Sequence, residues 1–109
     1  MATNTFTRYV ARNVGTTPVV LVTAASATQT TVIGLTAANT TTSPITVDAY
    51  ITASGNNYYV VKGATVPVGS SLALFGADGK IVLNTGDAFT VVASSASAAD
   101  VILSCLQIS

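Results

Sequence analysis

The chain has 109 residues, of which four are basic and four are acidic, so its net charge at pH 7 is zero. It contains no His, no Glu and no Trp, and only one Cys. Catalytic acids, bases, nucleophiles and metal ligands come mainly from side chains that are missing or rare here, so the composition argues against an enzyme, a cofactor site and a metal site. The two Arg and two Lys residues are scattered along the chain, which argues against a nucleic-acid surface.

The low charge also bears on how the surface is covered. Only 7% of the residues are charged, against about 25% in a typical soluble domain, whereas 50% are hydrophobic. Such a composition excludes a disordered chain. A protein without net charge is prone to associate, so either Thr and Ser hydroxyls keep its surface hydrated or other subunits cover much of it. The many small apolar residues favour the second explanation, a homo-oligomer.

The first regular pattern covers residues 5–13, where alternate side chains are predicted to lie on opposite faces of a strand. One face carries Phe6, Arg8, Val10 and Arg12, and the other carries Thr7, Tyr9 and Ala11. Residues 1–13 are predicted to form an N-terminal arm or an edge strand, followed by a β-sandwich domain of residues 14–109. An extended arm of this length would reach about 43 Å and contact a neighbouring subunit. The candidate interface residues in it are Phe6, Arg8, Tyr9, Val10 and Arg12.

Strand and turn signals then alternate along the first half of the chain. The predicted strands are residues 19–22, 31–38 and 45–53. The polar run 24–31 is predicted to be a loop, and Gly34 a bulge or close-packing point in the strand that follows. Residues 39–44 are the clearest turn by composition. The strand at 45–53 has the cleanest alternation, which predicts one buried and one polar face.

The second half continues with shorter elements. The predicted strands are residues 58–61, 65–68, 72–75, 80–83, 88–93 and 100–108. Turns at 54–57, 69–71, 76–79 and 84–87 and a small-residue loop at 94–99 separate them. Pro67 makes residues 65–68 an edge strand or a connection. Residues 100–108 are almost continuously apolar, which predicts a strand buried on both faces.

These elements predict the fold class. Seven to nine short antiparallel strands follow one another at spacings of 8–12 residues, and no segment has a convincing helical pattern. A chain of this kind buries its apolar faces by packing two sheets together. The prediction is therefore an all-β, single-domain β-sandwich of the jelly-roll-like type.

Three tyrosines lie around the turn at 54–57: Tyr50, Tyr58 and Tyr59. Tyr50 falls on the polar face of its strand, so we expect it to be exposed in the isolated subunit. Aromatic side chains at such a place suit a subunit interface, half-buried packing, or stacking on a sugar ring as in a lectin-like module. We expect an interface role for all three, because aromatic residues are common anchors of interfaces.

The remaining reactive side chains have structural interpretations. Asp78 and Asp87 lie beside Gly in turns, where an Asp accepts hydrogen bonds from backbone amides. Cys105 is expected to be a small buried core residue, with an intermolecular disulfide or a reactive thiol as alternatives. The N-terminus lacks the apolar core of a signal peptide, and the most apolar window is broken by Thr and Ser, so we expect no export and no membrane contact.

Four segments carry a resemblance to a known family: VIGLTAANTTTSPITVDAYI, YYVVKGATVPVGSSLALF, GKIVLNTGDAFTVVAS and DVILSCLQI. In their order of strands, turns and hairpin they resemble small virion structural proteins of tailed bacteriophages, particularly of cyanophages, over about 70% of the chain.

The resemblance implies a non-enzymatic virion component, assembled in the host cytoplasm, that binds copies of itself and other virion proteins. Capsid decoration (cement) and neck–tail accessory roles both fit it, and it implies no catalytic residue. The alternative is a carbohydrate-binding or adhesive β-sandwich module of the tail-fibre type.

Overall fold

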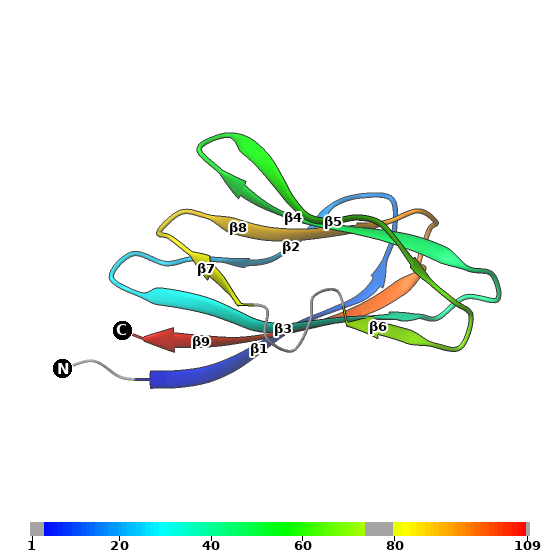
Figure 1. Ribbon diagram of the computed structural model, residues 1–109, viewed down its shortest axis with the longest axis horizontal. Coiled ribbons are helices and arrows are strands. Elements are labelled where there is room, and N and C mark those ends of the chain that lie inside the picture. The colour runs from blue at the N-terminus through cyan, green and yellow to red at the C-terminus, as the bar shows by residue number, and fades with distance from the viewer. Residues whose placement is uncertain (1–3, 74–79, 109) are drawn as a thin grey trace.

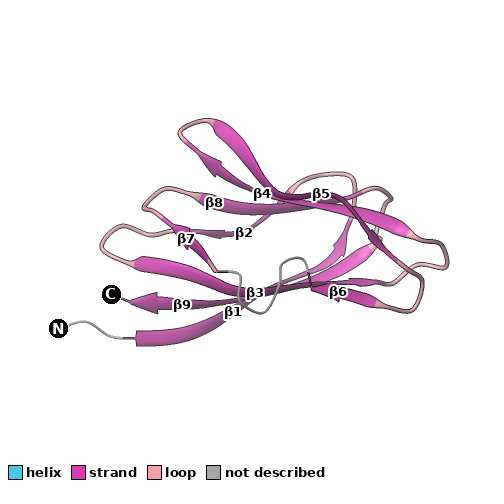
Figure 2. Ribbon diagram, in the orientation of Figure 1, coloured by secondary structure: helices cyan, strands magenta, loops and turns pink. Residues whose placement is uncertain are grey.

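A computed structural model describes residues 4–73 and 80–108. Strands dominate these residues, and no helix occurs among them (Figures 1 and 2). The strands are β1 (Asn4–Val14), β2 (Val19–Thr23), β3 (Gln29–Asn39), β4 (Ile45–Ala53), β5 (Asn56–Val66), β6 (Ser71–Ala73), β7 (Ile81–Leu83), β8 (Ala88–Ala93) and β9 (Ala99–Ile108). The described residues accordingly contain no helix long and apolar enough to cross a membrane.

The strands form two antiparallel sheets that face each other. Sheet A has the order β1-β9-β3-β6, with β7 also paired to β3, and sheet B has the order β2-β8-β4-β5. Because β6 and β7 pair with different parts of β3, the nine strands occupy eight positions. Two four-position sheets with these crossovers make a jelly roll, which confirms the predicted fold class. Figure 1 shows the sheets as two layers, with the start of β1 and the end of β9 at the same end of the molecule.

The core lies between the two sheets and is filled by the alternate side chains that each strand turns inward. Phe89 is its largest fully buried side chain. The other large ones come from both layers: Leu35, Leu83, Leu103, Val32, Val47, Val91 and Val101. The β-branched side chains favour the extended backbone, and their burial supplies the main stabilising term.

Two local devices fix how the strands meet. Ser54 and Gly55 both have positive φ, 53° and 81°, as a two-residue type I′ hairpin between β4 and β5 requires. At the end of β3, the buried Asn39 amide donates to the carbonyl oxygens of Ser43 (2.8 Å) and Val66 (3.0 Å). Its Oδ1 accepts from the backbone N–H and the hydroxyl of Thr41, both at 2.8 Å. Asn39 thereby ties the predicted turn at 39–44 to the end of β5.

The boundaries differ from the predictions at two places. Strand β3 begins at Gln29, inside the segment 24–31 that was expected to be a loop, because Thr30 and Thr31 pair with β7 and β9. The separate strands expected at 58–61 and 65–68 are one strand, β5, whose register shifts against β4 let it bend past Gly63 and end just before Pro67. The predicted bulge at Gly34 is confirmed by a register shift between Val32 and Gly34. The expected turn at 76–79 lies outside the described residues.

The last strand corrects a more important prediction. We expected β9 to be buried on both faces, but its burial alternates: Val101, Leu103 and Cys105 are fully buried and Ile102 is 49% exposed. The physical reason is that β9 is central in sheet A, whereas sheet B covers only one side of that sheet. The apolar residues on the other side of β9 face outward.

Candidate functional site

The N-terminal candidate residues divide between the two faces of sheet A. Strand β1 pairs with β9 from Asn4 to Val14, so within the chain it is an edge strand of that sheet. Its outward side chains are Phe6, Arg8, Val10 and Arg12, all exposed. Tyr9 is different, because it turns inward, packs against the core and accepts a hydrogen bond on its hydroxyl from Gln107 Nε2 at 3.0 Å. Tyr9 is therefore not part of the outer face of this subunit.

The strand register joins the outward residues of sheet A into rows. Phe6 lies beside Leu106, Leu106 beside Thr31, and Thr31 beside Val82. Two residues further along the strands, Arg8 lies beside Ser104 and Ser104 beside Gly34. A third row contains Val10, Ile102 and Thr36. The exposed fractions are 76% for Phe6, 64% for Val82, 55% for Val10 and 49% for Ile102. We call these three rows the outer face of sheet A.

A hollow of about 390 Å³ opens in the middle of this outer face, at the second row. Its lining is Phe6, Thr7, Arg8, Ile33, Ser104 and Cys105. The hollow exists because Gly34 has no side chain and its neighbour Ser104 has a small one; a Cβ added at Gly34 would be 3.9 Å from the Cβ of Ser104. Ile33, in the bulge of β3, stands at its rim.

Cys105 lies under this surface, on the inner face of sheet A. It is fully buried, which confirms the expectation of a core residue. Burial raises the pKa of its thiol, because desolvation disfavours the thiolate. The nucleophilic form of this cysteine is therefore suppressed.

The three tyrosines do not form one surface. Tyr50 and Tyr59 lie side by side with ring centroids 5.0 Å apart and an interplanar angle of 51°. Tyr58 pairs with Ile51, on the opposite face of sheet B, and is 56% exposed. The expectation that Tyr50 is exposed was wrong: it is 8% exposed, because the register places it between Tyr59 on β5 and Thr90 on β8.

Charged groups complete the cluster on the outer face of sheet B. Lys62 Nζ lies 4.4 Å from the centroid of the Tyr59 ring and 3.7 Å from Asp48 Oδ2. The other oxygen of Asp48 accepts a hydrogen bond from the backbone N–H of Gly63 at 2.6 Å. The aromatic rings, the ammonium and the carboxylate therefore find their interaction partners within the subunit.

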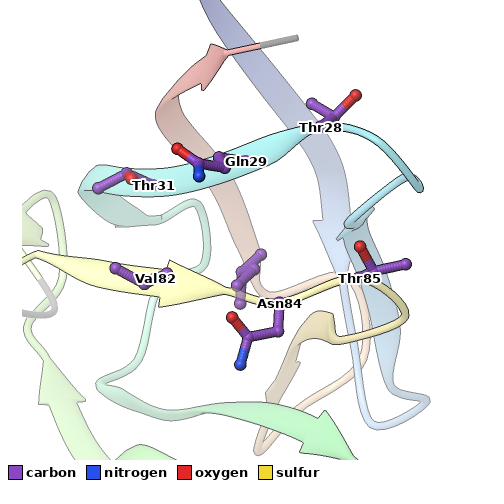
Figure 3. Close-up of a pocket in the computed structure, with 7 residues that line it drawn as sticks. Thr28, Gln29, Thr31, Val82, Asn84 and Thr85 are labelled. Carbon is purple, nitrogen blue, oxygen red and sulfur yellow. The ribbon is translucent and has the colours of Figure 1, made fainter.

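A second, polar pocket lies at the end of the sandwich where β3 begins and β7 ends (Figure 3). It measures about 300 Å³ and is lined by Thr28, Gln29, Thr31, Val82, Leu83, Asn84 and Thr85. Its hydroxyl and amide groups can form hydrogen bonds, but none of these side chains supplies an acid, a base or a strong nucleophile. Sequence patterns did not predict this pocket beyond its two polar connections, because only the fold brings those connections together.

The acidic residues that the structure describes act on backbone amides. Asp87 Oδ2 accepts from the N–H of Asn84 at 3.0 Å, which confirms its expected role in the turn. Asp100 Oδ1 accepts from the N–H of Asn13 at 3.1 Å. Asp78 lies outside the described residues. Within residues 4–73 and 80–108, no three His, Cys, Asp or Glu side chains are grouped as metal ligands would be.

Comparison with known proteins adds evidence on the fold. No protein-family model and no curated protein matches the sequence. Among solved structures, the chain is similar to one from Bacillus endospore appendages, which are described as a novel family of disulfide-linked pili. The sequence identity is 17%, the TM-score is 0.50, and the match covers 99% of this chain and 88% of that one. At this identity the likeness shows a shared fold.

Proposed function

We propose that this protein is a non-enzymatic structural subunit, and that it works by packing against copies of itself and against other proteins of a larger particle. The observation that carries the proposal is the outer face of sheet A, where four large apolar side chains on three strands are at least 49% exposed. Large apolar side chains that are exposed together on one face mark interaction sites in soluble proteins.

The composition supports the same proposal. The chain has eight charged residues, and two of them, Lys62 and Asp48, are engaged with each other on sheet B. Depletion of charge with apolar and aromatic groups at the centre is typical of subunit interfaces. A protein of similar fold belongs to endospore appendages that are described as pili, so the fold is compatible with assembly into long particles.

The particle that we propose is the virion of a tailed bacteriophage, with the protein as a capsid decoration (cement) or neck–tail accessory subunit assembled in the host cytoplasm. This part of the proposal is supported by the sequence resemblance over residues 31–108, and the partners would be itself and other virion proteins.

The experiment that tests the proposal is the native mass of the purified protein at several concentrations, by light scattering after gel filtration. We expect a closed oligomer or a concentration-dependent series of them. A monomer of 10.9 kDa at every concentration, with no binding to assembled phage capsids or tails, would contradict the proposal.

A second candidate is a glycan-binding module. It is supported by the polar pocket of about 300 Å³ and by the exposed ring of Tyr58. A glycan array would test it, with Asn84→Ala in the pocket and Tyr58→Ala on the hairpin as variants. Binding lost in either variant would support this candidate, and an array without hits would count against it.

A further inference from the structure

On the outer face of sheet A, strand β9 carries apolar side chains of the kind that are usually buried. Ile102, Leu106 and Ile108 all point away from the core along β9, whose sequence is that of a strand covered on both faces. Sheet B covers only the inner face, so a second layer is missing from the isolated subunit.

We propose that this second layer is the outer face of sheet A of another copy, related by a twofold axis parallel to the strands and lying between β9 and β3. The inference rests on the proposed function and names its partner and its surface. Packing of like faces about a twofold axis is the commonest form of homo-oligomer.

The size of the face suits a stable dimer. Strands β1, β9 and β3, about 4.8 Å apart along the ten residues of β9 at about 3.4 Å each, together with the six residues of β6 and β7, give a face of roughly 590 Å². Side-chain relief adds to that area, and a standard interface buries about 800 Å² per partner.

The direction of the axis follows from where the charges lie. Arg8 and Arg12 are both on β1, at one edge of the sheet, and neither forms an ion pair with a residue that the structure describes. An axis parallel to the strands places each β1 over the opposite edge of the partner sheet, so the arginines of the two copies lie at opposite rims. An axis perpendicular to the strands would instead place β1 of one copy on β1 of the other, which brings the arginines of the two copies close together. It would also place the Phe6 row over the end of β1 that carries Arg12.

The same axis matches apolar groups with apolar groups. Phe6 of one copy faces Val82 of the other, and the row of Val10 and Ile102 faces its own counterpart. Ile33, on β3, lies over the partner's β9 near Ser104, where the hollow is open to receive it. The two most exposed apolar side chains of this face, Phe6 and Val82, therefore face each other in the dimer, while Leu106 and Ile102 face Thr31 and Thr36.

Crosslinking tests this arrangement directly. In a Cys105→Ala background, which removes the natural thiol, Phe6→Cys and Val82→Cys are combined and the protein is treated with a short bis-maleimide reagent. The two new thiols face each other at about the 10 Å spacing of packed sheets, so we expect a covalent dimer on a denaturing gel. Phe6→Cys alone is the matched control, because its two copies would be roughly 17 Å apart, and we expect it to stay monomeric.

The alternatives give different bands. A dimer with Phe6→Cys alone would overturn the twofold axis proposed here. A dimer from Phe6→Cys with Val20→Cys, but not from Phe6→Cys with Val82→Cys, would mean that sheet A packs on the outer face of sheet B, where Val20 is 55% exposed. Either result overturns this inference and leaves the proposed function standing.

Light scattering of the uncrosslinked protein separates the two proposals further. We expect a dimer whose dissociation constant rises at least about tenfold in Ile102→Thr, a central position of the face, with circular dichroism unchanged. A protein that stays monomeric at every concentration overturns this inference. It overturns the proposed function as well only if assembled phage particles also fail to bind the protein.

Discussion

The outer faces of the two sheets differ in how far their exposed groups are satisfied within one subunit. On sheet B, Tyr50, Tyr59, Lys62 and Asp48 form a chain of contacts that ends on the backbone of Gly63. On sheet A, Phe6, Val10, Val82 and Ile102 are exposed, and Phe6 also lines a hollow in that face. An aromatic cluster is therefore not by itself a sign of an interface, whereas a face of exposed aliphatic and aromatic groups without polar partners is a stronger one.

The strongest change in stability is expected from removing the buried tyrosine ring on the outer face of sheet B. Tyr50→Ala should lower the free energy of unfolding by about 2–4 kcal/mol, because the ring is 8% exposed and fills the space between Tyr59 and Thr90. Urea denaturation followed by circular dichroism would measure it. Tyr50→Phe keeps the ring and should change little. A loss below about 0.5 kcal/mol in Tyr50→Ala would mean that the Tyr50 ring does not stabilise the subunit and that the tyrosine cluster is available as a binding surface.

The next effect is on association and not on folding. Phe6→Ser should leave the unfolding free energy of the subunit, measured at high dilution, within about 0.5 kcal/mol of the wild-type value, because the side chain is 76% exposed. The same change should weaken self-association at least about tenfold. Tyr58→Ser, an exposed aromatic outside the face, is the matched control and should leave association unchanged. If both changes weaken self-association equally, the outer face of sheet A is not the surface through which the protein associates.

A third effect compares the two sides of β9. Burial raises the pKa of the Cys105 thiol above its ordinary value, so the folded state binds this proton more tightly than the unfolded state does. Its contribution to stability is complete below the unfolded pKa of about 8.5 and is lost as the pH rises towards the folded pKa. Stability should thus fall more steeply above about pH 9 in the wild type than in Cys105→Ala.

Thiol labelling gives the matching readout on the two faces. In native protein, Cys105 should react with a thiol reagent far more slowly than a cysteine introduced by Ser104→Cys in the Cys105→Ala background, at low protein concentration. Equal rates for the two cysteines would mean that position 105 is not buried and position 104 exposed, which contradicts the assignment of the inner and outer faces of sheet A.

The smallest effect is expected from the ion pair on sheet B. Lys62→Met should cost less than about 1 kcal/mol, because the Lys62 side chain is 67% exposed and its contacts with Asp48 and the Tyr59 ring are screened by water. Denaturation at low and at high salt would measure it, and the difference between the two proteins should shrink at high salt. A larger loss would show that the charged groups hold the tyrosine cluster in place.

Much of the fold could be predicted from the sequence because its signals are local. The alternation of residues 5–13 and 45–53, the bulge at Gly34 and the turn at Asp87 were all confirmed. Two errors of boundary, at Gln29 and across Gly63, arose where pairing with a distant strand extended an element beyond its own propensity. Of the exposed residues on the outer face of sheet A, those of β1 were predicted from the sequence, while Val82 and Ile102 were not.

Composition, alternation and turn residues are enough to predict a charge-poor chain of short strands, because they are properties of the chain and of neighbouring residues. Which side of each strand is covered depends on how the two sheets pack. Tyr50, on a polar face, is buried by Tyr59 and Thr90, and Ile102, in an apolar run, is exposed because one sheet can cover only one side of another. Alternation separates the two faces of a strand, but the neighbours that cover them come from distant parts of the chain.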